Sequence, residues 1–98
     1  MRAILHPEAD REFQEAIEYY QAQSQDLGIR FYREVLGALV RLESHPKVWP
    51  GLRGNVRKCL VADFPYQLLY TVEPDRIHVL AVMHAKRKPG YWTERLPG

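Results

Sequence analysis

The first half of the chain repeats its apolar residues at the spacing of an α-helix. After a short apolar segment at residues 2–5, two series of apolar residues follow, each recurring every three or four positions and separated by a polar stretch. The two series consist of Ala9, Phe13, Ala16, Ile17 and Tyr20, and then of Phe31, Val35, Ala38, Leu39 and Leu42. This period places the apolar side chains on one face of each helix. The pattern therefore predicts a short strand and two amphipathic helices joined by a turn at residues 21–26.

Prolines mark the ends of these segments. Pro7 suits the first turn of the first helix, because a missing N–H costs nothing there. The second helix is expected to end before Pro46, since the residue before a proline is pushed out of the helical region. Residues 44–55 carry two prolines, two glycines and an asparagine, and this composition predicts a loop.

The second half of the chain changes to a period of two, which is typical of strands. Residues 56–62 alternate between two faces, and residues 66–72 are rich in aromatic and β-branched side chains. A hairpin turn at residues 73–75 leads into residues 76–84, which are apolar on both faces and therefore predict a central strand.

This order, β-α-α-β-β-β, predicts an α+β fold in which an N-terminal antiparallel helix hairpin packs on a small antiparallel sheet. Ninety-eight residues fit one domain, residues 1–98. We expect Phe64, Tyr66 and Tyr70 on the core face of the sheet, because they share a face by alternation. The opposite face is expected to be free for a partner or substrate.

Composition narrows the class of protein. No apolar run approaches the length of a membrane span, which needs roughly 18 residues. No signal peptide is visible either, so a cytoplasmic protein is expected. A single cysteine, Cys59, excludes an intrachain disulfide and is expected to be a small buried residue. The four histidines lack the spacing and the carboxylates of a ligand set, so neither a metal nor another cofactor is expected.

The net charge of +2 conceals an uneven distribution. Residues 1–45 hold five basic and eight acidic side chains and carry a net charge of −3, whereas residues 46–98 carry +5. Such a split within one small domain predicts a basic C-terminal face that meets nucleic acid or an acidic partner.

The residues after the last predicted strand are the main candidates for chemistry. His84 is followed by Lys86, Arg87 and Lys88 and then by Tyr91 and Trp92. Cations can hold phosphates and aromatic rings can stack on bases, so metal-free RNA cleavage by Arg57, His84, Arg87 and Tyr91 is one interpretation. The alternative is that Tyr91 and Trp92 pack the tail onto the core while the cations remain in solvent.

At these residues the sequence resembles the RelE/ParE superfamily of toxins from bacterial type II toxin–antitoxin modules. The resemblance runs through most of the chain, and its most specific parts are the Phe-Pro-Tyr entry into a strand at residues 64–66 and the His-Ala-Lys-Arg segment at residues 84–87. It implies the β-α-α-β-β-β plan and a toxin held inactive by a cognate antitoxin. The RelE branch cleaves mRNA on the ribosome, whereas the ParE branch inhibits DNA gyrase.

Residue by residue, the resemblance favours the ParE-like, plasmid-stabilisation members. Arg87 matches a phosphate-binding arginine of the RelE branch, but Ala62 stands where that branch has a second arginine and Thr93 stands near its tyrosine. We therefore expect a growth-inhibiting toxin that binds a protein target such as DNA gyrase. A ribosome-dependent mRNA endoribonuclease and an inactive, binding-only family member are the alternatives, so whether the protein is an enzyme stays open.

The resemblance also implies a partner-binding surface. An antitoxin is expected to place acidic residues against the basic C-terminal cluster and an amphipathic helix in an apolar groove. The residues expected to contact it are Lys86, Arg87, Lys88, Tyr91 and Trp92.

Overall fold

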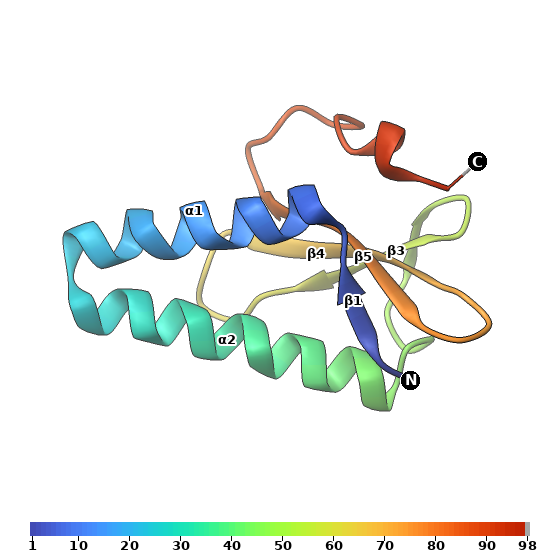
Figure 1. Ribbon diagram of the computed structural model, residues 1–98, viewed down its shortest axis with the longest axis horizontal. Coiled ribbons are helices and arrows are strands. Elements are labelled where there is room, and N and C mark those ends of the chain that lie inside the picture. The colour runs from blue at the N-terminus through green and yellow to red at the C-terminus, as the bar shows by residue number, and fades with distance from the viewer. Residues whose placement is uncertain (98) are drawn as a thin grey trace.

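The computed structural model describes residues 1–97, so all of the expected domain except its last residue is described. The elements are β1 (Ala3–Leu5), α1 (Pro7–Gln23), α2 (Gln25–Ser44), β2 (Gly51–Arg53), β3 (Val56–Leu60), β4 (Tyr66–Val72), β5 (Ile77–His84) and the 3₁₀-helix η1 (Thr93–Arg95). Figure 1 shows the two helices side by side along the sheet, with the C-terminal segment returning past the N-terminal end of α1. The predicted α+β class, a helix hairpin packed on a sheet, is confirmed.

The helix hairpin is tighter than the polar stretch in the sequence predicts. α1 begins with Pro7, and the His6 side chain accepts a hydrogen bond from the N–H of Glu8 at 3.0 Å. Only Ser24 separates α1 from α2, and its side chain makes no capping bond. The expected turn at residues 21–26 is therefore mostly helical, because the polar residues there lie on the exposed surface of two continuous helices.

Close contacts hold the two helices together. A Cβ atom on Gly28 would lie 2.9 Å from Cβ of Gln21, so only glycine allows this approach of the backbones. Nearby, the rings of Phe13 and Tyr32 stack with centroids 5.8 Å apart and planes 4° apart. The hairpin thus packs as one layer before it meets the sheet.

The strands form one five-stranded sheet in the order β1-β5-β4-β3-β2. The pairs β5–β4, β4–β3 and β3–β2 are antiparallel, whereas β1 lies parallel to β5. The sheet is therefore mixed rather than purely antiparallel, because the helix hairpin lets β1 lie alongside β5 in the same direction. β5 lies between two strands, as its apolar character on both faces predicts.

One strand was not expected. β2 occupies part of residues 44–55, which the sequence predicts to be a loop throughout. Two residues, Gly54 and Asn55, connect β2 to β3, and Gly54 has a φ of +55°. Two-residue hairpin turns favour glycine and asparagine because they require positive φ. The Gly-Asn pair was the signal for this additional strand.

The main core lies between the helices and the sheet. Its largest fully buried side chains from these two layers include Phe31, Leu42, Leu68 and Tyr70. The Tyr70 hydroxyl donates a hydrogen bond to the carbonyl of Pro46 at 2.7 Å, and burial raises the pKa of Tyr70 to about 12. Phe64 and Tyr66 pack against the same core, so the predicted shared face of the three aromatic residues is confirmed.

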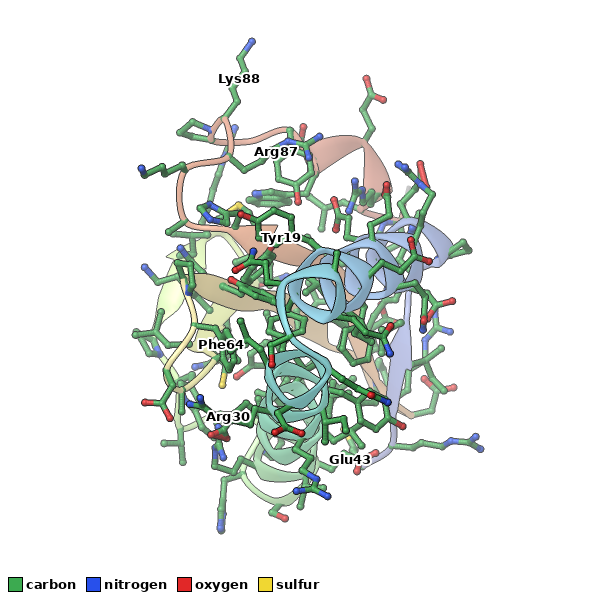
Figure 2. All side chains as sticks on the ribbon, turned by 90° about the vertical axis from the view of Figure 1, so that its left-hand side faces the viewer. Tyr19, Arg30, Glu43, Phe64, Arg87 and Lys88 are labelled. Carbon is green, nitrogen blue, oxygen red and sulfur yellow. The ribbon has the colours of Figure 1, made fainter. Side chains whose placement is uncertain are left out.

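Aromatic rings extend this core to the connected ends of the helices. Phe64 meets Tyr20 and Phe31 edge-on, with centroids 5.0 and 5.1 Å away. The guanidinium of Arg30 lies 5.8 Å from the Phe64 ring, and the two side chains are neighbours in Figure 2. The Phe-Pro-Tyr entry to β4 therefore has a packing role.

A second cluster covers part of the opposite face of the sheet. Leu69, Leu80, Ala81 and Met83 pack there around Trp92, which is only 3% exposed. An extra residue in β5, where the register to β4 shifts, lets consecutive residues Leu80 and Ala81 join this cluster. The expectation of a free face is wrong for this part, because exposed apolar side chains of a central strand need a cover.

Two further sequence expectations concern single features. Cys59 is fully buried, as predicted, and burial raises the pKa of its thiol. Within residues 1–97 no helix is long and apolar enough to cross a membrane.

A buried histidine predicts how stability changes with pH. His78 is 9% exposed; its Nδ1 lies 3.4 Å from Oε2 of Glu73, and its ring lies 5.8 Å from that of His6. Burial, together with the charge of Arg76 and the proximity of His6, lowers the pKa of His78 below its ordinary value of 6.5, although Glu73 opposes this. The unfolded chain therefore binds this proton more tightly than the folded protein.

We expect the free energy of unfolding to fall as pH decreases below about 6.5, by at most about 1.4 kcal/mol per pH unit for one proton. Urea unfolding between pH 8 and 5.5 measures this. The His78→Gln variant should have a flatter profile in that range. A profile as steep as that of the wild-type protein would show that His78 is not the responsible group. The lowered pKa of Glu73 acts separately, near pH 4.5 and below.

Candidate functional site

The chain after β5 turns back on itself and exposes its cations. The backbone N–H groups of Lys86 and Arg87 donate to Nδ1 and to the carbonyl of His84, both at 3.0 Å. This turn carries Lys86, Arg87 and Lys88, which we call the basic turn. Figure 2 shows Lys88 pointing away from the body of the protein and Arg87 lying above Tyr19 of α1, with which it lines one groove.

Beyond the basic turn, residues 89–97 fold over the sheet. Gly90 has a φ of +81°, a conformation that glycine adopts without strain. It redirects the chain toward the second cluster. Trp92 then enters that cluster, and the N–H of Thr93 donates to the carbonyl of Gly90 at 3.1 Å. The basic turn is thus held between β5 on one side and a buried tryptophan on the other.

A buried glutamate holds the segment to α1. Glu12 Oε2 accepts hydrogen bonds from the hydroxyl of Tyr91 at 2.7 Å and from Nη2 of Arg95 at 3.0 Å. Its Oε1 accepts from Nη1 of Arg95 at 2.9 Å and from the backbone N–H of Val82 at 3.1 Å. The side chains of Glu12 and Arg95 are only 10% and 11% exposed. We call these four residues the Glu12 network.

The network forms where β5 has a neighbouring strand on one side only. β1 ends at Leu5, so on the side away from β4 the backbone groups of β5 beyond Val79 have no partner strand. Glu12 accepts from the N–H of Val82, and Nη1 of Arg95 donates to the carbonyl of Leu80 at 3.0 Å. Side chains therefore satisfy the backbone groups that would otherwise attract another strand.

A second glutamate acts in the same way at the edge of the sheet. Glu43, near the end of α2, accepts a hydrogen bond from the N–H of Ala3 in β1 at 2.8 Å. Carboxylates of the helix hairpin therefore accept hydrogen bonds from backbone N–H groups of both β1 and β5.

Hydrogen bonds and charges within the Glu12 network determine the protonation states of Arg95 and Tyr91. Burial alone would lower the pKa of Arg95, but the hydrogen bonds and charge of Glu12 outweigh it and raise that pKa. Burial and the hydrogen bond to the carboxylate raise the pKa of Tyr91. Tyr91 therefore stays protonated at neutral pH and donates its hydrogen bond to Glu12.

Two guanidinium groups lie over the ring of Tyr91. The central carbon of Arg87 is 4.1 Å from the ring centroid, and that of Arg95 is 5.0 Å away. Cation–π attraction of this kind contributes about 0.5–1 kcal/mol at exposed sites and more where water is excluded. The Glu12 network thus positions Tyr91, and Tyr91 positions Arg87.

The structure brings three of the four predicted catalytic residues together. His84, Arg87 and Tyr91 line one groove of about 280 Å³, which Glu12 and Glu15 also line. The fourth, Arg57, lines a different pocket of about 260 Å³.

Arg57 is engaged in that second pocket by the loop before β2. Its Nη1 donates to the carbonyls of Lys47 and Trp49 at 3.2 and 2.6 Å. Because both hydrogen bonds go to backbone carbonyls, the guanidinium of Arg57 supports the loop before β2.

The predicted partner-binding residues lie in one continuous segment, but their exposure differs. Lys86, Arg87 and Lys88 are exposed, whereas Tyr91 is half-buried and Trp92 is buried. The packing of both rings onto the protein matches the alternative in which they fix the tail while the cations remain in solvent.

Sequence reasoning missed Glu12 and Arg95. Glu12 directly precedes Phe13 and lies at the border of the apolar face of α1, where a carboxylate is usually exposed. Arg95 lies in a short polar segment with no recognisable pattern. Their pairing depends on how the C-terminal segment folds back, and no local signal encodes that.

A family model decides the classification. The model for the ParE toxin of the parDE type II toxin–antitoxin system matches residues 3–89, from β1 through the basic turn. The chain belongs to the ParE toxin family. The resemblance to RelE/ParE toxins is therefore confirmed.

A solved structure agrees with this classification at the level of fold. A chain of the chromosomal ParDE TA system from P. aeruginosa superposes with a TM-score of 0.75 and 12% sequence identity, covering 86% of this chain and 95% of that one. No curated protein sequence matches this chain. At this identity the fold is kept while most residues differ, so the contacts of this ParE toxin depend on its own side chains.

Proposed function

We propose that this ParE-family toxin is inactivated by a cognate antitoxin and acts by binding a protein target such as DNA gyrase. The observation that carries the proposal is the match to the ParE family over residues 3–89. The state of the candidate catalytic groups supports it. The Tyr91 hydroxyl is bonded to Glu12, and Arg57 is bonded to backbone carbonyls in a separate pocket.

An mRNA endoribonuclease is the second candidate, because His84, Arg87 and Tyr91 line one groove. Such an enzyme needs a general base, a general acid and cations on the developing charge. Tyr91 as a base would require a lowered pKa, whereas burial and the Glu12 carboxylate raise it. The groove therefore supports binding better than proton transfer.

Expression of the protein alone separates the candidates. A ParE-like toxin should arrest growth and leave a reporter plasmid less negatively supercoiled, while primer extension on translated messages shows no new cuts. Cuts in the ribosomal A site would contradict the proposal in favour of the ribonuclease. Unimpaired growth would identify a binding-only family member. Co-expression of the antitoxin should restore growth.

The surface offers two features that suit an antitoxin. The basic turn is exposed and would attract acidic residues. On α2, four exposed apolar side chains recur every three or four residues and would suit an amphipathic helix. They are Ile29, Tyr32, Leu36 and Val40, which are 40%, 45%, 38% and 59% exposed.

Reversal of charge in the basic turn should slow antitoxin binding. We expect Arg87→Glu combined with Lys88→Glu to lower the association rate constant at low salt by at least about tenfold, because complementary charge mainly accelerates encounter. Stopped-flow mixing at two salt concentrations measures this.

A control with the same change of net charge is Arg2→Glu combined with Arg41→Glu, both outside the C-terminal segment and both exposed. Its association rate should change much less. If both double variants slow association equally, net charge rather than the basic turn steers the antitoxin.

A further inference from the structure

A pocket of about 330 Å³ lies on the face of the sheet opposite the helices, beside the C-terminal segment. Its floor includes Gln67 of β4 and Met83 of β5, which are cross-strand neighbours. Arg53, Lys58 and Arg87 surround it from β2, β3 and the basic turn. The pocket therefore collects cations from three separate parts of the chain.

The charged side chains that line this pocket are all positive. Arg53, Lys58 and Arg87 line it, and no aspartate or glutamate among the described residues does. No ion pair among residues 1–97 engages these three cations. The groove on the other side of the basic turn differs, since Glu12 and Glu15 line it. An anion is thus favoured in the sheet-face pocket and disfavoured in the neighbouring groove.

Gln67, which lines the pocket, carries an unsatisfied polar atom. Oε1 of Gln67 is buried and has no hydrogen-bond partner within residues 1–97. Buried polar groups in folded proteins nearly always have a partner, because losing water without compensation is costly. A ligand that brings a backbone N–H group could satisfy it once the Gln67 side chain turns its amide toward the pocket.

Apolar surface adjoins the polar groups. Met83 and Trp92 line the pocket, and Leu52 beside them is 44% exposed. Leu60, the cross-strand neighbour of Gln67, is 63% exposed on the same face. The site therefore suits a ligand in which negatively charged groups flank an aliphatic side chain.

We propose that this pocket binds an extended, acidic segment of the antitoxin. An aliphatic side chain of the segment would enter between Met83 and Leu52, a backbone amide would pair with Gln67, and neighbouring carboxylates would pair with Lys58 and Arg53. The assignment rests on the proposed function. It adds a defined binding site and the chemistry of the antitoxin segment that binds there.

The aromatic residues argue for a peptide rather than RNA. Base stacking needs a free aromatic face. Trp92 is 3% exposed, and the Tyr91 ring lies beneath the guanidinium groups of Arg87 and Arg95. The exposed apolar side chain at the pocket, that of Leu52, is aliphatic, and it suits the side chains of a peptide better than the rings of a base.

The test is the affinity of the purified full-length antitoxin for variants of the pocket, measured by titration calorimetry. Lys58→Met keeps the aliphatic stem and removes the charge, and it should weaken binding about ten- to a hundredfold through loss of a charge-assisted hydrogen bond. Gln67→Leu should weaken binding about fivefold through loss of a neutral one.

Two controls accompany these variants. Lys47→Met alters a lysine that lines the separate Arg57 pocket, and it should change the affinity less than about twofold. The stability of Gln67→Leu separates binding from folding. Because the substitution removes an unpaired buried atom, its urea midpoint should equal or exceed that of the wild-type protein while its affinity falls.

Selective weakening by Lys58→Met and Gln67→Leu would support the assignment. Binding that all three variants retain would overturn the assignment alone, whereas no binding by the wild-type protein would overturn the proposed function together with it. A short single-stranded RNA that competes with the antitoxin, and binds in a manner that depends on Lys58 and Gln67, would also overturn it in favour of nucleic acid.

Discussion

Replacement of Glu12 by alanine is expected to lower the free energy of unfolding by about 3–5 kcal/mol. The substitution leaves the guanidinium of Arg95 buried without its carboxylate. It also leaves the hydroxyl of Tyr91 and the N–H of Val82 without their acceptor. Urea unfolding followed by circular dichroism measures the loss.

Glu15→Ala is the matched control, because Glu15 lies three residues further along α1. Its carboxylate is 59% exposed and pairs with Arg11, which is equally exposed. An exposed pair of this kind contributes about 0–1 kcal/mol. Equal losses in the two variants would show that the Glu12 network does not stabilise the fold.

A double variant distinguishes a buried charge from lost packing. Glu12→Leu combined with Arg95→Met removes both charges and keeps most of the apolar volume. Replacing a buried ion pair by apolar groups is often neutral or stabilising, so the double variant should recover the part of the stability that Glu12→Ala loses through the unpaired charge of Arg95. The hydroxyl of Tyr91 and the N–H of Val82 still lack their acceptor in it. Antitoxin binding by this variant would then report whether the basic turn is still positioned.

Trp92→Ala is expected to cost about 3–5 kcal/mol, the usual cost of removing a buried tryptophan from a core. Trp92 covers Leu69, Leu80 and Met83 on the face of the sheet opposite the helices. Its loss exposes that cluster and releases residues 89–97. We also expect weaker antitoxin binding, because the basic turn and the sheet-face pocket share this segment as a wall.

Leu60→Ala provides the comparison on the same face. The Leu60 side chain is 63% exposed. Its truncation should therefore change the unfolding free energy by no more than about 0.5 kcal/mol. Chemical unfolding is followed by circular dichroism, because this signal, unlike tryptophan fluorescence, does not depend on Trp92. A Trp92→Ala variant as stable as Leu60→Ala would mean that the C-terminal segment does not pack in solution as described.

Local patterns in the sequence predicted the elements well. The helical period of residues 9–20 and 31–42 located both helices, because each buries a single stripe of apolar residues. The apolar character of residues 76–84 on both faces placed β5 inside the sheet. These features depend on the immediate neighbourhood of each residue, so periodicity detects them.

Features that depend on distant contacts were missed. The parallel pairing of β1 with β5 joins residues from opposite ends of the chain. The Glu12 network joins α1 to the C-terminal segment over a similar separation. The basic turn was found from composition, but Gln67 lines a pocket with it only because β4 pairs with β5 beside it.

Gyrase supercoiling tests the central claim most directly. Purified gyrase and relaxed plasmid are incubated with ATP and an excess of this ParE-family protein, with and without equimolar antitoxin. The proposed function predicts that the protein inhibits supercoiling and that the antitoxin restores it. Supercoiling that continues unchanged at micromolar excess of a folded, growth-arresting protein would contradict it.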